Sequence, residues 1–362
     1  MATGFKSATV RAADVPATQT NFPTYVDLDR LGITTLAEAQ SVRVYADSAK
    51  TTEWAREIVS VTEMHVKVPS LTSTVSMFVD WDGVRSDYAV TATYGAQNVW
   101  TEYEAVWHLK ETSGNTTDST SNANTLTDNN TVGTATGKIG IGRDFELSNS
   151  EYFSITDNSS LSIVGDISFS GWIKLEQLPS TAGSSMQIQV KDDTSGSRSY
   201  AFYINQNDKL VLLYFDGSSN LTRSISDSAI VVGGDVGNLV HLVGTADVSA
   251  KTIIFYKNGS SVASTNDFSY ASSIRDGSSD FRIGARSVAG SASEFFDGVM
   301  DEQRIYSGIL SDDWTTTEYN NQNAESTFWG TWADVSTATT VTNIISIGNI
   351  VELNNISSII GT

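Results

Sequence analysis

The feature that most constrains this chain is a long series of short segments in which apolar and polar residues alternate. The pattern is clear in "SVRVYAD" (41–47), "VSMFVDW" (75–81) and "SYAFYIN" (199–205). A period of two is typical of strands with one buried face. Such segments recur between Gly-, Ser- and Asn-rich connections, with little helical periodicity, so we predict an all-β protein built from two-sheet sandwiches.

The alternating segments divide into two groups. Residues 1–100 contain four of them and predict a small N-terminal β-sandwich. Residues 101–328 predict a larger two-sheet sandwich or jelly roll, in which Asn258-Gly259 forms a hairpin turn because both residues accept positive φ. The strands expected in these two domains are 24–29, 41–47, 64–69, 75–81, 151–156, 167–176, 186–191, 199–205, 209–215, 239–247 and 252–257.

The C-terminal part differs from the rest. The segment 310–322 predicts one short helix, with Ser311 as N-cap and two aspartates in its first turn. The nearly uncharged, Ile- and Asn-rich residues 329–362 predict a β-arm. We favour an intersubunit contact for this arm over an added strand on the same chain, because an exposed apolar strand pairs readily.

Composition excludes several classes of function. The net charge of −20 opposes binding to nucleic acid. The absence of cysteine excludes disulfides and thiolate chemistry. We expect neither membrane insertion nor a secretory signal, since the chain has no long apolar run and no apolar segment after its first basic residues.

The first domain resembles a known family in the blocks "VPATQTNFPTYVDL", "SVRVYADSAKTTEWAREI" and "MHVKVPSL". This family is a β-sandwich of uncharacterised function found in bacterial surface proteins and phage virion proteins. His65 stands where the family usually has tryptophan, and the closing aromatic motif is absent from "VSMFVDWDG".

The second domain is similar to laminin-G-like, concanavalin A-like lectin/glucanase jelly rolls. The similarity is carried in order by "AVWHLKETSGNTTDSTSNANT", "GKIGIGRDFELSNSEYFSI", "ISFSGWIKL" and "FFDGVMDEQRIYSGILSDDWTTTEYNNQ". Together the two resemblances imply a small sandwich followed by a jelly roll with one short helix near its C-terminal end, to which the tail sequence adds the β-arm.

The pairing of the two domains looks most like a phage virion protein of the tail, a fibre or the capsid decoration. It implies a non-enzymatic structural component in many copies, with virion proteins as partners and an outward lectin-like domain for host-surface glycans. The alternative is a carbohydrate-binding adhesion module on a bacterial surface or in the medium. A glycoside hydrolase is the remote alternative.

A calcium site is implied by the laminin-G resemblance, in which the loop after the first strand shares an ion with the closing acidic block. The matching positions are Asp118 and Asp301, with Asn122 or Asn124 adding an oxygen. Such oxygen ligands suit Ca²⁺. The alternative is that the loop contains only Asx-turns.

Several other side chains have positions that the strand pattern predicts. His108 is expected on a sheet face, bonded to a backbone carbonyl. Asp301 and Glu302 should point to opposite faces of a strand, which argues against a paired-carboxylate glycosidase. Trp172 is expected in the core, as are most strand tyrosines, although four of these could stack on sugars: Tyr200, Tyr203, Tyr214 and Tyr270.

Overall fold

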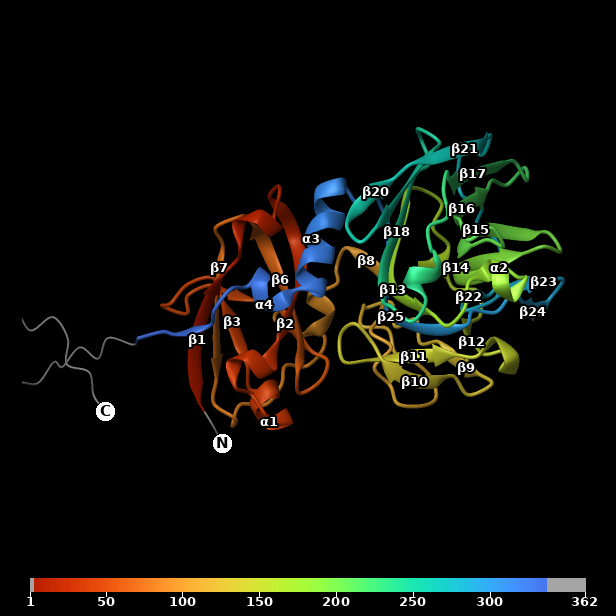
Figure 1. Cartoon of the computed structure of the whole chain (residues 1–362). Helices are drawn as coiled ribbons and strands as arrows, with labels where there is room; N and C mark the ends of the chain where they lie inside the picture. Colours follow the sequence, from red (N-terminus) through yellow and green to blue (C-terminus); the bar gives the residue numbers. More distant parts are fainter. Residues whose placement is uncertain (1–2, 337–362) are drawn as a thin grey trace, which may run out of the picture.

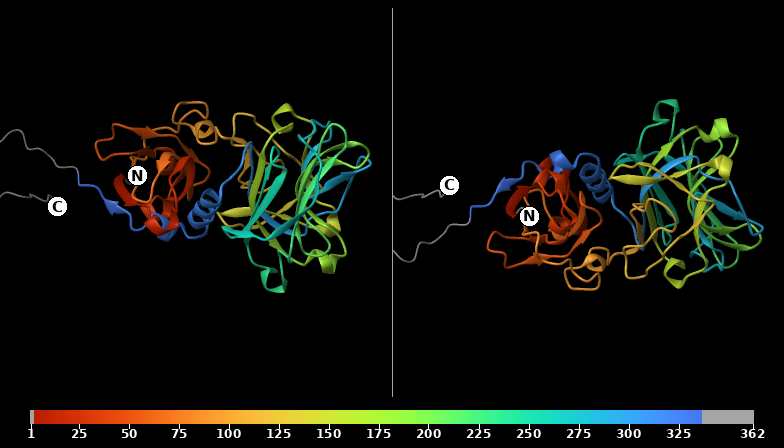
Figure 2. Two further views of the ribbon diagram at one scale, coloured as in Figure 1. Left: turned by 90° about the horizontal axis from the view of Figure 1, so that it is seen from above. Right: turned by 90° about the horizontal axis from the view of Figure 1, so that it is seen from below.

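The computed structural model describes residues 3–336 and places two β-rich domains next to each other. The N-terminal domain lies on the left in Figure 1, the larger domain on the right, and helix α3 (Asp312–Asn323) between them. Views from above and below place α3 between the domains as well (Figure 2). No helix in residues 3–336 combines the length and apolar character needed to cross a membrane.

The N-terminal domain is a small sandwich of two sheets, which confirms the predicted β class. Its apolar core takes side chains from both sheets, for example Val66 from one and Val79 from the other. The three-stranded sheet is β2 (Gln19–Asp27), β6 (Glu63–Leu71) and β5 (Arg56–Ile58). The five-stranded sheet is β26 (Ala333–Asp334), β1 (Gly4–Thr9), β7 (Ser76–Trp81), β3 (Arg43–Tyr45) and β4 (Glu53–Trp54).

The larger domain is a jelly roll of two sheets around a second core. One sheet is β10 (Gly133–Thr136), β11 (Ile141–Phe145), β25 (Gly298–Tyr306), β13 (Ile167–Leu175), β18 (Val240–Asp247), β19 (Thr252–Lys257) and β20 (Ser260–Val262), with β8 (Tyr103–Trp107) beside β25. The other is β21 (Ser264–Ser269), β17 (Leu221–Ser226), β16 (Leu210–Phe215), β15 (Ser197–Ile204), β14 (Met186–Asp193), β22 (Phe281–Ile283), β12 (Tyr152–Ile155) and β9 (Thr127–Asn129), with β23 (Arg286–Val288) and β24 (Ser291–Ser293) at β14.

The local sequence signals match these elements closely. Each predicted strand overlaps an observed one, and the hairpin between β19 and β20 has positive φ at both Asn258 and Gly259. Helix α3 begins after Ser311, whose side chain accepts a hydrogen bond from the backbone N–H of Trp314. Three shorter helices were not predicted: α1 (Leu36–Gln40), α2 (Pro179–Ala182) and α4 (Glu325–Phe328).

After α3 the chain returns to the N-terminal domain. Phe328, Trp329 and Trp332 enter that domain's core, and β26 pairs with β1. The described start of the predicted arm is therefore an added strand on the same chain, which corrects our preference for an intersubunit contact there. Residues 337–362 of the arm lie outside the described residues.

The two sheets of the jelly roll have different surroundings. The outer face of the sheet containing β13, β18 and β25 meets α3 and the N-terminal domain, as Trp172 shows: it is buried against His241 and Tyr319. Trp172 is thus buried as predicted, but beneath α3 rather than between the sheets. The ten-stranded sheet turns its outer face away from the N-terminal domain (Figure 1). We call these the covered face and the open face.

Candidate functional site

A β-bulge in β25 shapes the centre of the covered face. Strand β13 pairs with β25 through Ser170↔Arg304 and Trp172↔Asp301, so two residues of β25 lie opposite Gly171. At the bulge, the backbone of Glu302 adopts a left-handed conformation with a φ of 51°. A bulge re-aims side chains in this way.

The bulge corrects the expected directions of Asp301 and Glu302. Met300 and Ile305 belong to the core between the sheets, whereas Asp301 pairs with the outward-facing Trp172 and Glu302 contacts the N-terminal domain. Both carboxylates are therefore on the covered face. They are also fully buried, so neither is accessible to a polysaccharide.

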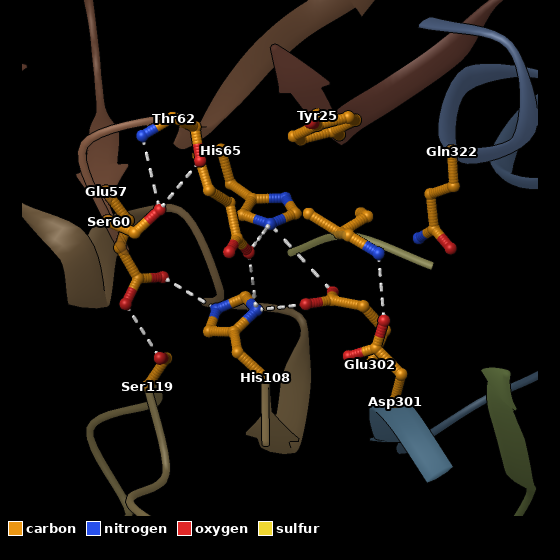
Figure 3. Close-up of polar contacts among 12 residues, drawn as sticks. Tyr25, Glu57, Ser60, Thr62, His65, His108, Ser119, Asp301, Glu302 and Gln322 are labelled. Atoms are coloured by element: carbon orange, nitrogen blue, oxygen red, sulfur yellow. Dashed lines mark hydrogen bonds and ion pairs between the residues drawn. The ribbon is translucent and has the colours of Figure 1, made fainter. Parts of the chain in front are cut away.

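Side chains from the two domains converge at this point: His65, His108 and Glu302 can be followed in Figure 3, and Glu63 lies with them. Glu63 and His65 come from β6, while His108 follows β8 and Glu302 lies on β25. His65 Nε2 lies 3.1 Å from Glu63 Oε1 and 3.9 Å from Glu302 Oε2. His108 Nδ1 lies 2.6 Å from Glu302 Oε1 and 3.5 Å from Glu63 Oε1. We call this set the junction cluster.

A second layer of polar groups holds the junction cluster. Glu57 Oε2 lies 3.2 Å from His108 Nε2 and accepts a hydrogen bond from Trp100 Nε1 at 2.5 Å. Its other oxygen accepts a bond from the Ser119 hydroxyl at 2.7 Å. On the opposite side, Arg304 donates to Glu302 and to Glu318 of α3.

The buried charges shift one another's protonation. Burial alone would lower the pKa of His108, but the charges of Glu302 and Glu57 raise it to about 10. Burial lowers the pKa of His65 to about 3. Burial and the neighbouring Glu302 charge raise the pKa of Glu63 well above its usual value. Without a bound cation, the cluster thus holds a protonated His108 and a neutral His65.

The predicted hydrogen-bond partner of His108, a backbone carbonyl, is wrong. The alternation itself holds, because Trp107 and Leu109 enter the core while His108 faces outward. Its nitrogens, however, contact carboxylates from Glu57 and Glu302 rather than a backbone carbonyl. The sequence separations of 51 and 194 residues hide these contacts from sequence reasoning.

The residues predicted to bind calcium fall into two places. Asp118, Asn122 and Asn124 lie in one loop, where both Asp118 oxygens accept backbone N–H groups, including that of Asn124. The side-chain amides of Asn122 and Asn124 donate to the backbone oxygen of Glu104. Asp301 instead accepts hydrogen bonds from the backbone N–H groups of Lys138 and Ile139. Calcium binding at these positions stays a prediction.

The open face carries a different surface, formed by an apolar patch with polar groups around it. The patch contains Val190, Ala201, Leu213 and Phe215, with Tyr203 and Leu221 packed against it. Arg198 lies over the Phe215 ring at 4.0 Å and pairs with Asp192. The four core members of the patch are at most 7% exposed, so the accessible groups lie around them, among them Arg198 with a side chain that is 31% exposed.

Tyr203 is a partly exposed aromatic residue of the open face. It pairs across the sheet with Gln187, which donates to Glu294 at 2.6 Å. Within residues 3–336, Gln187 Oε1 and Arg286 Nε have no hydrogen-bond partner, but both atoms are buried and not accessible to a ligand. Of the other tyrosines considered for sugar stacking, Tyr200 and Tyr214 are buried and thus unsuited, whereas Tyr270 is 64% exposed.

Comparison with known families gives a match within the larger domain. Residues 147–314 match the model of the concanavalin A-like lectin/glucanases superfamily. This match agrees with the two-sheet jelly roll and with the four sequence blocks that indicated it, so the larger domain is concanavalin A-like. A search of curated proteins gives no match.

Solved structures with partial similarity include three binding domains or modules. The binding domain of Paraclostridial Mosquitocidal Protein 1 is 14% identical with a TM-score of 0.49, covering 60% of this chain and 52% of that one. The Ruminococcus gnavus IT-sialidase CBM40 bound to α2,6-sialyllactose is 15% identical with a TM-score of 0.36, and the match covers 44% of this chain and 86% of that one. The third structure is Domain 4 of AbnA, a GH43 extracellular arabinanase from Geobacillus stearothermophilus, in complex with arabinotriose. It is 21% identical with a TM-score of 0.40, and the match covers 59% of this chain and 97% of that one. The chain thus spans about half the length of the mosquitocidal protein's binding domain.

Proposed function

We propose that this protein is a non-enzymatic recognition protein whose concanavalin A-like domain binds a glycan on its open face. The observation that carries the proposal is the surface around Tyr203 on a lectin-type fold. Sugar rings stack on aromatic side chains, and their hydroxyl groups both donate and accept hydrogen bonds. On the same face, Arg198 and Glu294, whose side chains are 31% and 30% exposed, supply a hydrogen-bond donor and an acceptor.

The covered face supports the non-enzymatic part of the proposal. The adjacent carboxylates Asp301 and Glu302 were the pair considered for glycoside cleavage. Both are fully buried, and the backbone N–H groups of Lys138 and Ile139 occupy one Asp301 oxygen. Hydrolysis would require these groups on both sides of a sugar bond.

The biological setting that we propose is a phage virion. The resemblance of the first domain to a family of virion and bacterial surface proteins, together with the lectin-type second domain, supports this setting. In it the N-terminal domain attaches to capsid or tail proteins, the protein is present in many copies, and the open face meets glycans of the host surface.

A glycan array probed with the full chain tests the binding proposal. We expect binding to a defined group of glycans, and we expect Tyr203→Ala to weaken it about tenfold or more through lost stacking and hydrogen bonding. Tyr94→Ala, on the N-terminal domain, is the matched control and should bind like the wild type. Equal binding by the Tyr203 variant, or no binding to any glycan, would contradict the proposal.

Antibody labelling of purified phage particles tests the virion setting separately. Regular labelling of the capsid or tail in electron micrographs is the expected result. Labelling of bacterial surfaces, with none on particles, would favour the alternative of a bacterial adhesion module.

A further inference from the structure

We propose that Glu63, His65, His108 and Glu302 form a closed site for one divalent transition-metal ion, of which Zn²⁺ is the best fit, and that this ion links the two domains. Imidazole nitrogens and carboxylate oxygens are established zinc ligands. The junction cluster offers two of each, with ligand atoms that all lie within 4.8 Å of one another.

The ligand atoms are close enough together to hold one tetrahedral ion. Four of the distances between them are 3.1, 3.9, 3.5 and 2.6 Å. They lie on both sides of about 3.3 Å, the ligand separation in a tetrahedral site with metal–ligand bonds of 2.0–2.1 Å, and His65 and His108 approach different oxygens of Glu302. Small side-chain movements would therefore suffice to place an ion among the four groups.

The groups behind the ligands have the arrangement expected around a metal. A histidine that ligates a metal usually donates a hydrogen bond from its second nitrogen to a carboxylate or carbonyl. His108 has this geometry, since Nδ1 faces the cluster and Nε2 faces Glu57 at 3.2 Å. Trp100 and Ser119 fix Glu57 in turn, and Arg304 fixes Glu302.

The charge around the cluster also favours a cation. Five acidic side chains are buried in this network (Glu57, Glu63, Asp301, Glu302 and Glu318). Among the described residues the guanidinium of Arg304 contacts two of them, and His108 faces Glu57, Glu63 and Glu302. A buried carboxylate needs a charged partner or a metal to offset its lost hydration. Asp301 Oδ1 has no hydrogen-bond partner in the described part of the chain.

The position of the cluster defines the role of the ion. Each domain supplies one glutamate and one histidine, so one ion would cross-link the three-stranded sheet of the N-terminal domain to the covered face. All four side chains are at most 5% exposed. A site so enclosed leaves no open position for a substrate, which is the character of a structural metal site.

Metal analysis of the full chain tests the proposal. The protein is stripped with a chelator, dialysed against Zn²⁺, and measured by mass spectrometry of the metal and by calorimetry. We expect about one equivalent of Zn²⁺ per chain and a melting temperature that rises with Zn²⁺ and falls with chelator. Less than about a fifth of an equivalent, with an unchanged melting temperature, would overturn the proposal and leave a protonated hydrogen-bond network.

Variants test the assignment of the ligands. The chain has three histidines and no cysteine, so each histidine can be changed in turn. His65→Gln and His108→Gln should abolish the stoichiometric binding, whereas His241→Gln, a buried histidine bordering Glu318, should retain it. Glu63→Gln and Glu318→Gln form a second matched pair with the same expectation. Equal loss in the control variants would overturn the assignment.

A variant of Glu57 tests the second layer of polar groups behind the ligands. Because Glu57 orients His108 without being a ligand, Glu57→Gln should keep the stoichiometry and weaken the affinity about 10–100-fold. Unchanged affinity would contradict the proposed second layer, and the wild-type measurement stays decisive where a variant fails to fold.

Discussion

The covered and open faces of the concanavalin A-like domain carry similar charged side chains in opposite surroundings. On the covered face, Glu302, Arg304 and Glu318 are 1–2% exposed. On the open face, the Arg223 and Asp267 side chains are 28% and 32% exposed. Charges without water require fixed partners, whereas hydrated charges exchange partners easily. One face is therefore suited to permanent attachment and the other to reversible contacts.

The largest effect is expected at Arg304. Arg304→Ala removes the guanidinium between two buried carboxylates, Glu302 and Glu318. We expect the free energy of unfolding to fall by about 3–5 kcal/mol, because uncompensated buried charge is strongly destabilising. Urea unfolding followed by tryptophan fluorescence measures it, and a loss below about 1 kcal/mol would contradict the contrast between the faces.

A pH-dependent effect is expected where the returning segment joins the N-terminal domain. Burial raises the pKa of Glu325, the partner of Arg30, to about 7. A carboxyl group with a raised pKa stabilises the fold below its unfolded pKa, and this contribution is lost as pH rises through the folded pKa. The wild type should lose at most about 3 kcal/mol between pH 4.5 and above pH 7 from this group.

The variant Glu325→Gln isolates this contribution, because glutamine resembles the protonated acid but does not titrate. The difference in unfolding free energy between wild type and variant should change with pH across this window. A difference that stays constant from pH 4.5 to 8 would contradict the raised pKa.

The open-face counterpart of Arg304 should have a small effect. Arg223→Ala removes the ion pair with Asp267 and the contact with the Phe268 ring. A partly exposed ion pair contributes less than about 1 kcal/mol. The same urea experiment compares the two arginines. A loss of unfolding free energy as large as that of Arg304→Ala would show that the charges of the open face are also buried and depend on fixed partners.

The smallest effect is expected from calcium at the loop containing Asp118. Both Asp118 oxygens already accept hydrogen bonds within the loop, so any ion would replace existing partners. We expect binding no tighter than millimolar to submillimolar, as in weak extracellular calcium modules. Calorimetric titration of wild type and Asp118→Asn measures it, and tight binding lost in the variant would show that the loop rearranges around the ion.

The sequence by itself determined the local features of this protein. Alternation determines which side chains of β8 or β13 enter a core, Ser311 caps α3, and Asn258-Gly259 turns a hairpin, because each depends on neighbours a few residues away. The four blocks of the second domain likewise identified its concanavalin A-like fold.

Only the tertiary structure decided how these elements combine into sites. The bulge at Glu302 places two adjacent carboxylates on one face, and the domain contact brings His65 to His108. The returning segment places Trp329 in the N-terminal core. Side chains far apart in the sequence meet because of how sheets and domains pack, and the periodicity of a single strand contains no information about that packing.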